Sequence, residues 1–309
     1  KTIHLGLKGI KLNGAVIPQG WNVSMNQGIQ KVSVCKDSNI VTSVCKSPVV
    51  ITKRLENFDD GSEKVELSFF RDGRWKKLIA SRSSVFNRNS IIKYADSGLP
   101  ISSSSAAELV AYLSDYENAN IDKIPLVRSI ARVGWLDNRS FFPYCTQKEI
   151  IFESESSEVN GIIDATIPHG SMDIWKKYAV VARKNPFARF ILSASFASPL
   201  LKLLDSRVFF IHIWHDSQSG KTAVMKFAVS VWGDASKLMG SFNATSVGLE
   251  RMAGILKHLP FAIDELQVLN DRRLSLEKII YSLGNGYGRV RGNKNGGMQN
   301  IPTWQNIMI

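Results

Sequence analysis

The chain has 309 residues, of which 44% are hydrophobic and 21% are charged, and its formal net charge is +12 at pH 7. This length allows two domains, each with a full hydrophobic core. The sequence has no run of about 18 apolar residues and no signal-peptide pattern, so we expect no membrane span. Three cysteines (Cys35, Cys45 and Cys145) lack the spacing of a metal site and indicate a reducing cytoplasm.

The positive charge is spread unevenly along the chain. Residues 1–100 carry 16 basic and 8 acidic side chains, residues 101–206 carry 11 and 12, and residues 207–309 carry 12 and 7. Basic surface on both end segments favours a polyanionic partner such as DNA. The alternative is that this charge serves solubility alone.

The first 155 residues are predicted to form an α+β N-terminal domain. Asp-Gly turns between apolar runs are strong hairpin signals. Two such turns separate three expected strands, over residues 48–52, 65–70 and 75–80. A short helix is expected at 90–94 and a further hairpin around Asp137. Ser105 and Glu108 have the spacing of a capping box, which predicts a helix from there to about Tyr116.

Residues 156–206 are predicted to form a helical connecting segment. The polar stretch 153–160 is expected to be a loop or domain boundary, and helices are expected over 171–178 and 186–204. The second helix has apolar side chains on nearly all faces, so we expect it to be buried between the N-terminal domain and the C-terminal segment.

A nearly complete phosphate-binding loop begins the third segment, residues 207–309. The apolar run 208–214 predicts a buried parallel strand, and residues 222–231 predict a helix without Gly or Pro. Between them the chain matches G-x-x-x-x-G-K-[ST] except at the first glycine, where His215 stands. A histidine tolerates positive φ better than most residues, so the loop can still form. The expected ATP-binding residues are His215, Asp216, Ser217, Gln218, Ser219, Gly220, Lys221 and Thr222.

The chemistry of such a loop depends on its last residues. Backbone N–H groups and the start of the helix bind the phosphates, the lysine adds a positive charge, and the Thr hydroxyl ligates Mg²⁺. We therefore expect a catalytic role for Lys221 and a magnesium role for Thr222. The alternative is a degenerate loop that keeps the fold but has lost the nucleotide.

A second acidic element lies where an ATPase needs one. Residues 259–265 form a short apolar run that ends in Asp264 and Glu265. At such a strand end the aspartate holds Mg²⁺ through its water shell, and the adjacent glutamate acts as general base toward the attacking water. Both are therefore candidate catalytic residues, and Asp264 is also a candidate magnesium residue. The alternative is an ordinary helix start with acids in its first turn.

Two further features lie on either side of this acidic element. Thr245 or Ser246 is expected to cap a helix over 247–258. Residues 284–297 contain six glycines, three basic residues and no acid. A basic loop of this kind can bind a phosphate backbone, which makes Arg289, Arg291 and Lys294 candidate DNA-binding residues. It can also be a solvated loop, or one of its arginines can reach a nucleotide on a neighbouring subunit.

With these motifs in view, the chain resembles the family called domain of unknown function 927, over nearly all of its length. The resemblance depends on residues 132–135, 187–204, 219–222, 230–233, 243–245, 248–250, 264–265 and 288–291, followed by Trp304. It departs from the family at His215, where many relatives have glycine. It implies an AAA+-type ATPase from phages and mobile genetic elements, related to hexameric helicases of the minichromosome-maintenance type. In that class a hairpin before the sensor strand contacts DNA, and residues 284–297 occupy the matching position.

The interpretation is an α+β domain followed by an α/β P-loop, AAA+-like ATPase core that is truncated at its C-terminal end. We expect an ATP-dependent DNA helicase or translocase, using ATP and Mg²⁺, acting on single-stranded DNA and hexameric in its full length. The sensor, arginine-finger and lid residues would then lie beyond Ile309, and the fragment alone would be a poor ATPase. The alternative functions are a nucleotide-gated DNA-binding or loading module without unwinding activity, and a signalling ATPase that does not act on DNA.

Overall fold

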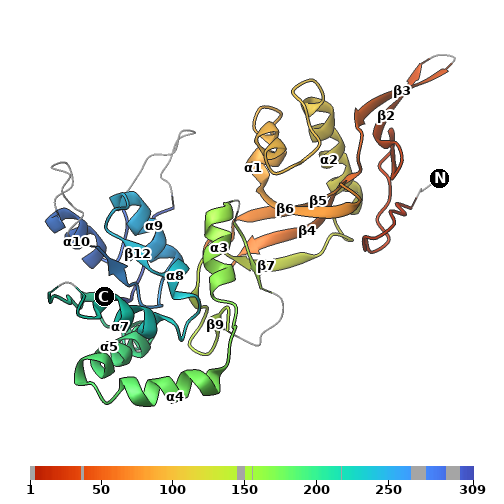
Figure 1. The fold of residues 1–309 in the computed structure, drawn as a ribbon. Helices are drawn as coiled ribbons and strands as arrows, with labels where there is room; N and C mark the ends of the chain where they lie inside the picture. Colours follow the sequence, from red (N-terminus) through yellow and green to blue (C-terminus); the bar gives the residue numbers. More distant parts are fainter. Residues whose placement is uncertain are drawn as a thin grey trace. The chain divides into compact units, whose positions relative to one another are not determined.

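The computed structural model describes residues 4–35, 38–144, 150–154, 156–216, 218–265, 276–289 and 300–309. The chain forms two compact units, which Figure 1 shows with their elements labelled. Unit 1 comprises Lys1–Ile130 and Lys148–Glu155, and unit 2 comprises Ala131–Gln147 and Ser156–Ile309. In the described part of the chain, no helix has the length and apolar character needed to cross a membrane.

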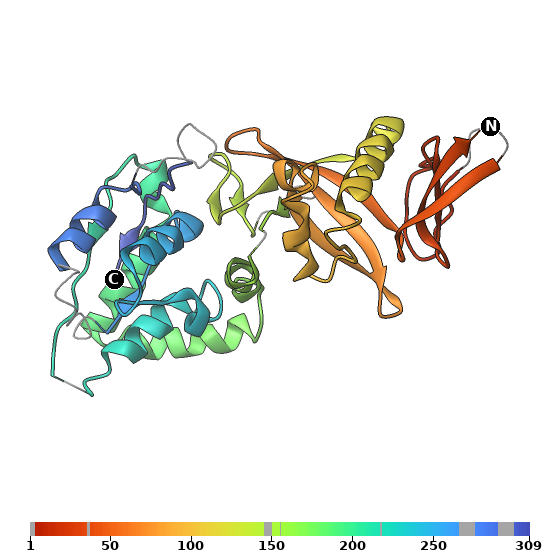
Figure 2. The same ribbon diagram turned by 90° about the horizontal axis from the view of Figure 1, so that it is seen from above.

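Unit 1 contains two sheets. The smaller is an antiparallel meander of β1 (Trp21–Ser24), β2 (Gly28–Cys35) and β3 (Ser38–Cys45), drawn in red to orange in Figure 2. The larger has the order β10-β7-β4-β5-β6. Its strands are β4 (Val49–Asn57), β5 (Glu63–Arg71), β6 (Arg74–Ser81), β7 (Leu126–Ile130) and β10 (Ile151–Phe152).

The Asp-Gly turns that the sequence predicted join β4 to β5 and β5 to β6. At the second turn Asp72 has φ 54° and Gly73 has φ 74°. Positive φ at both central residues is what a two-residue hairpin turn with the right twist requires. The three predicted strands and their hairpin connections are therefore confirmed.

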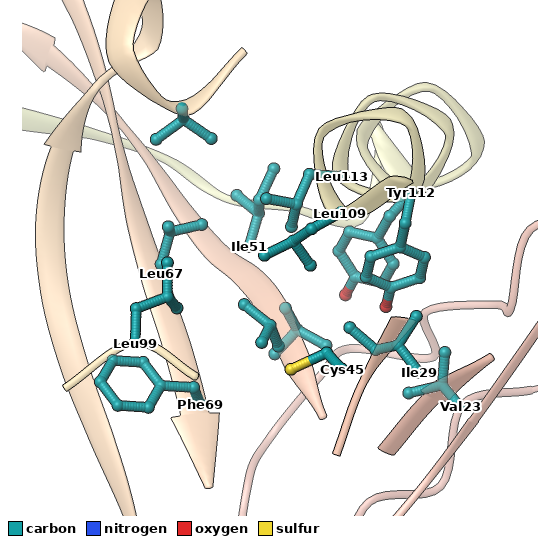
Figure 3. Packing of buried hydrophobic residues seen from close by; sticks show 14 of the residues in the cluster. Val23, Ile29, Cys45, Ile51, Leu67, Phe69, Leu99, Leu109, Tyr112 and Leu113 are labelled. Carbon is teal, nitrogen blue, oxygen red and sulfur yellow. The ribbon is translucent and has the colours of Figure 1, made fainter. Parts of the chain in front are cut away.

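The core of unit 1 lies between these sheets and α2 (Ala106–Asn120). Figure 3 shows Leu109 and Leu113 of α2 beside Ile51 of the large sheet, and Tyr112 directed toward Ile29 and Val23 of the small sheet. Two short elements, α1 (Arg82–Val85) and the 3-10 helix η1 (Ile91–Ala95), precede α2. Burying a leucine side chain contributes about 1.5–3 kcal/mol, so the buried leucines of this layer stabilise the unit substantially.

The predicted capping box at the start of α2 is wrong. Ser105 is the N-cap residue, but its side chain makes no capping hydrogen bond and its hydroxyl donates to the carbonyl of Ser102 instead. Glu108 forms an ion pair with Lys31, with a distance of 2.8 Å between Nζ and Oε2. The local spacing predicted that the Glu108 carboxylate would cap the helix backbone. In the structure it binds Lys31 of β2 instead.

Within the described residues of unit 2, four short strands run parallel. They are β11 (Phe209–Phe210), β12 (Gly240–Ser241), β13 (Ile263–Asp264) and β14 (Ile307–Met308). β11 pairs with β14, β12 pairs with β13, and a parallel bridge between Phe261 and Met308 joins the two pairs. The spatial order is therefore β11-β14-β13-β12, so β14 lies between β11 and β13.

Helices surround this sheet. They are α3 (Ser157–Ala165), α4 (Met172–Ala182), α5 (Pro186–Ala197), α6 (Leu200–Leu203), α7 (Lys221–Val229), α8 (Ala235–Leu238), α9 (Ser246–Leu256) and α10 (Leu276–Gly284). The expected hairpin around Asp137 is present as β8 (Gly134–Trp135) and β9 (Phe141–Phe142), and it belongs to unit 2.

The helical segment 156–206 is part of the same unit as the phosphate-loop helix, whereas the sequence had set it apart. The reason is a set of contacts to α7 and its C-terminal end. Trp175 stacks on Phe227 with ring centroids 5.4 Å apart, and the Ser195 hydroxyl donates to the carbonyl of Ala228 at 2.5 Å. The indole of Trp232 in turn donates to Ser195 at 2.9 Å.

The prediction that residues 186–204 form one buried helix is wrong in two respects. The segment contains two helices, α5 and α6, because Pro199 interrupts the helical hydrogen bonds. Ile191 is fully buried, but Phe190 is 59% and Leu204 is 70% exposed. Apolar composition alone therefore did not decide which side chains the fold covers. The strand predicted at 208–214 is likewise shorter than expected, and Trp214 is 82% exposed.

Candidate nucleotide-binding site

The predicted phosphate loop leads from β11 to the first turn of α7. Gly220 is the N-cap of that helix and has φ 86°. A side chain would be strained there even though no atom lies within 4 Å of the position of an added Cβ, so glycine is required by its backbone conformation. Gln218 also has positive φ, at 65°. His215 does not have a positive φ. The left-handed conformation expected at this residue is found at Gln218 instead. Ser217 lies outside the described residues.

Lys221 folds back over this loop. Its Nζ donates to the carbonyl oxygens of His215 at 2.8 Å and Asp216 at 2.7 Å, and it lies 3.3 Å from the hydroxyl of Ser219. The ammonium group is thereby held inside the curve of the loop. A positive charge surrounded by exposed backbone at a helix N-terminus is suited to binding phosphate oxygens.

Thr222 and Asp264 meet at the end of the sheet. The Thr222 hydroxyl, in the first turn of α7, donates to Oδ2 of Asp264 at 2.6 Å. Asp264 is the last residue of β13, so its carboxylate lies at the carboxyl end of a parallel strand, where open α/β sheets bind ligands. The two residues are 42 positions apart in the chain. The structure therefore brings together the two side chains that the sequence predicted for magnesium.

This donor pair fits Mg²⁺. The ion prefers oxygen ligands and usually keeps several waters, so one hydroxyl and one carboxylate with substrate phosphates form a normal site. Among the described residues, no group of three or more His, Cys, Asp or Glu side chains could hold a metal by itself. The oxygen set at Thr222 and Asp264 is consequently suited to an ion that arrives with a nucleotide.

Glu265 follows Asp264 and is held by two contacts. Its backbone N–H donates to Oδ1 of Asp264 at 2.8 Å, and its Oε2 accepts from the hydroxyl of Ser241 at 2.8 Å. Its backbone φ is 65°, a conformation that costs a non-glycine residue about 1–3 kcal/mol. The Ser241 hydroxyl thus holds the Glu265 carboxylate at the end of β12, and the backbone contact holds residue 265 against Asp264.

Sequence reasoning missed Ser241. This residue ends β12, and the pairing of β12 with β13 places it opposite Asp264. Its hydroxyl also accepts from the N–H of Asn243 at 3.1 Å. The available signal was a serine at the end of the strand between the loop and the acidic element. A serine at that position can be recognised as a partner of Glu265 only once the strand order is known.

The glycine-rich stretch begins as one side of an antiparallel stem. Tyr287 forms a bridge with Thr303, the N–H of Gly288 donates to Pro302 and the N–H of Trp304 donates to Gly286, both at 2.8 Å. Arg289 is the last described residue on this side of the stem. Its Nε lies 3.6 Å from Oε1 of Glu250, which belongs to α9. Arg291 and Lys294 lie outside the described residues.

Other motifs prove structural. Trp135 donates its backbone N–H to Nδ1 of His258 at 3.0 Å and its indole N–H to Pro199 at 2.8 Å. A Cβ on Gly134 would stand 2.3 Å from the same His258 nitrogen, so only glycine fits. Burial, with a smaller contribution from the nearby charge of Arg132, lowers the pKa of His258 to about 3. Thr245 caps α9 as predicted, its hydroxyl accepting from Gly248 at 3.1 Å.

These observations describe a mixed α/β protein with a strand–loop–helix element and a hydroxyl–carboxylate pair at the carboxyl ends of parallel strands. A family model described as Domain of unknown function (DUF927) matches residues 21–303. The chain belongs to that family, as the sequence motifs predicted. A search of curated proteins found no match to the chain.

Proposed function

We propose that this protein is a P-loop ATPase of the AAA+ type that acts on DNA as a helicase or translocase. The observation that carries the proposal is the 2.6 Å hydrogen bond between Thr222 and Asp264. A Thr after the loop lysine and an Asp at a neighbouring strand end are the two residues that hold Mg²⁺ in P-loop ATPases. The position of β14 between β11 and β13 supports the AAA+ branch, in which a strand separates the loop strand from the acidic strand.

The residues of the site have distinct roles in the proposed hydrolysis. Exposed backbone N–H groups before α7 bind phosphate oxygens, and Lys221 neutralises charge that develops as the terminal phosphoryl group is transferred. Thr222 and Asp264 would hold Mg²⁺, which supplies further charge neutralisation when it is bound. Glu265 accepts a proton from the attacking water, and Ser241 orients its carboxylate.

DNA is the proposed partner of the glycine-rich stem. Arg289, Arg291 and Lys294 are the residues proposed to contact phosphates. The other basic candidate, in unit 1, has its own internal partners. Lys76 pairs with Asp72 at 2.6 Å and Lys77 with Glu66 at 3.3 Å, and Arg71 donates to the carbonyl of Gly98 at 2.7 Å. The stretch in unit 2 is preferred because its glycine-rich sequence, residues 284–297, carries three basic residues and no acid.

The wider setting is proposed from the family resemblance. It comprises a hexameric assembly of the complete protein, a cytoplasmic location and a role in replication of a mobile element or phage. A nucleotide-gated module that loads or anchors a replication complex without unwinding is the second candidate. It would use the same loop for ATP and the basic N-terminal domain to load or anchor the complex, and it would not separate strands.

The test is an ATPase and strand-separation assay of the complete protein with and without single-stranded DNA. A helicase gives turnover that rises with DNA and separates a forked duplex, whereas a loading module binds ATP and DNA without separating strands. The matched variants are Asp264→Asn and Asp234→Asn. Asp234 is also a carboxylate that accepts from a nearby hydroxyl, that of Ser236, but it lies in the N-cap of α8. Loss of turnover in D264N but not in D234N supports the site; equal turnover in both refutes it.

A further inference from the structure

Glu250 is a buried acid with three contacts to the stem and the helix before it. Only 4% of its side chain is exposed. Oε1 accepts from the Ser282 hydroxyl of α10 at 2.7 Å, and Oε2 accepts from the backbone N–H of Arg289 at 3.3 Å. The guanidinium Nε of Arg289 lies 3.6 Å from Oε1. A buried carboxylate without such partners would be strongly destabilising, so these contacts offset the cost of burying it.

Arg289, unlike Glu250, is exposed to solvent. Its side chain is 57% exposed, although it pairs with a buried acid. The distance of 3.6 Å is longer than the 2.7–2.9 Å of a strong charged hydrogen bond. An ion pair this long, with one partner exposed to water, is a weak one. The Arg289 guanidinium is thus accessible to a polyanion and weakly bound by Glu250. The Glu250 carboxylate is buried and cannot move with it into solvent.

We propose that the Glu250 carboxylate is an intramolecular competitor of the DNA phosphate for the guanidinium of Arg289. Without DNA, Glu250 neutralises Arg289 and holds it against α9. With DNA, a phosphate oxygen replaces Oε1, and Glu250 keeps its hydrogen bonds to Ser282 and to the backbone of residue 289. Binding then includes the loss of one internal ion pair. This inference rests on the proposed function, since it takes DNA as the ligand of the stem.

The competition predicts how neutralising Glu250 should change DNA affinity. In Glu250→Gln the amide oxygen can still accept from Ser282, but the charge that competes with phosphate is gone. We expect the Kd for single-stranded DNA to fall by about two- to fivefold, the range that a part-exposed ion pair supports. The dependence of log Kd on log salt should keep its slope, because the number of phosphates contacted is unchanged.

The experiment measures the Kd of a fluorescent oligothymidylate for the complete protein across a salt series. The variants are E250Q, Arg289→Ala and the double variant. Glu277→Gln is the matched control, because it removes an exposed acid of α10 without touching Arg289. Ser282→Ala controls for loss of the other hydrogen bond to Glu250. Thermal melting of each variant reports whether it folds like the wild type.

The expected result is tighter binding in E250Q but not in E277Q, and no further effect of E250Q once Arg289 is removed. Equal tightening in E250Q and E277Q would show a general charge effect and overturn the competition. Weaker or unchanged DNA binding in folded E250Q would show that Glu250 only anchors the stem, and would overturn it as well. If wild-type protein binds no DNA while Lys221→Ala still loses ATP binding, the DNA part of the proposed function fails instead.

Discussion

The hydroxyl of Ser241 is predicted to control turnover without affecting nucleotide affinity. Ser241→Ala removes the 2.8 Å hydrogen bond to Oε2 of Glu265 and leaves the loop, Lys221 and the Thr222–Asp264 pair in place. Glu265 keeps its backbone hydrogen bond to Asp264 and its positive φ. Its carboxylate, however, loses the side-chain partner that orients it. A general base that leaves its productive orientation transfers protons less often.

The size of the effect depends on the kind of hydrogen bond. A bond to a charged acceptor contributes about 1.5–3 kcal/mol when it is sheltered from water. Ser241 is half-buried and Glu265 is exposed, so we take about 1 kcal/mol, which corresponds to roughly a fivefold fall in kcat. The Kd for ATP should stay within about twofold, because neither residue contacts the phosphate-binding backbone.

Steady-state hydrolysis and equilibrium binding of a fluorescent ATP analogue separate these quantities. Ser241→Thr keeps a hydroxyl and should restore most of the rate. Ser236→Ala is the matched control, since it removes another exposed serine–carboxylate bond, 2.6 Å long, from the same unit. An unchanged kcat in S241A, or a loss that threonine does not restore, would show that Ser241 does not position Glu265.

Three further predictions address the loop, the stem and a buried histidine. Lys221→Ala should abolish ATP binding and hydrolysis, whereas Glu265→Gln should bind ATP and lose turnover; binding titrations paired with phosphate release check both, and wild-type turnover in E265Q would disprove the general-base role. Replacing Arg289, Arg291 and Lys294 by alanine should lower the log–log salt slope of DNA binding by roughly 0.7–0.9 per lost contact, with basal ATPase retained; an unchanged slope would redirect attention to the basic residues of unit 1. Because the pKa of His258 falls from 6.5 to about 3 on folding, the folded state excludes a proton that the unfolded state binds. Stability should therefore be full above about pH 6.5 and decline as pH falls toward 3, by at most about 1.4 kcal/mol per pH unit. Denaturant titrations at several pH values, compared with His258→Gln, measure this contribution, and identical pH profiles would contradict it.

Local patterns predicted the elements whose determinants lie close together in sequence. The hairpins of unit 1 depend on a two-residue turn, and Asp72 with Gly73 adopts the required backbone. The phosphate loop depends on contiguous residues, and Gly220, Lys221 and Thr222 take the positions that the pattern implies. The capping box at Ser105 failed because Glu108 had a stronger partner, Lys31, 77 residues away in the chain.

Burial was the property that composition predicted least well. Residues 186–204 are apolar on nearly every face, and that pattern is the same whether a neighbouring element covers a face or not. In the structure α5 directs Ile191 inward, where it is fully buried, and leaves Phe187 and Phe190 41% and 59% exposed. Which face of α5 packs depends on the positions of the sheet and of α7. Those positions depend in turn on contacts between residues that are distant in sequence.

Ser241 and Glu250 show the same limit within the site itself. Neither was predicted as a site residue, and Ser241 lies 24 positions from Glu265 and Glu250 lies 39 positions from Arg289. Ser241 becomes a partner of the acid only because β12 pairs with β13, and Glu250 becomes a partner of the stem only because α9 packs beside α10. Motifs identify the atoms that react or bind charge, since that chemistry allows few residue types. The groups that orient those atoms can be any hydroxyl or carboxylate within reach, so the three-dimensional arrangement is needed to find them.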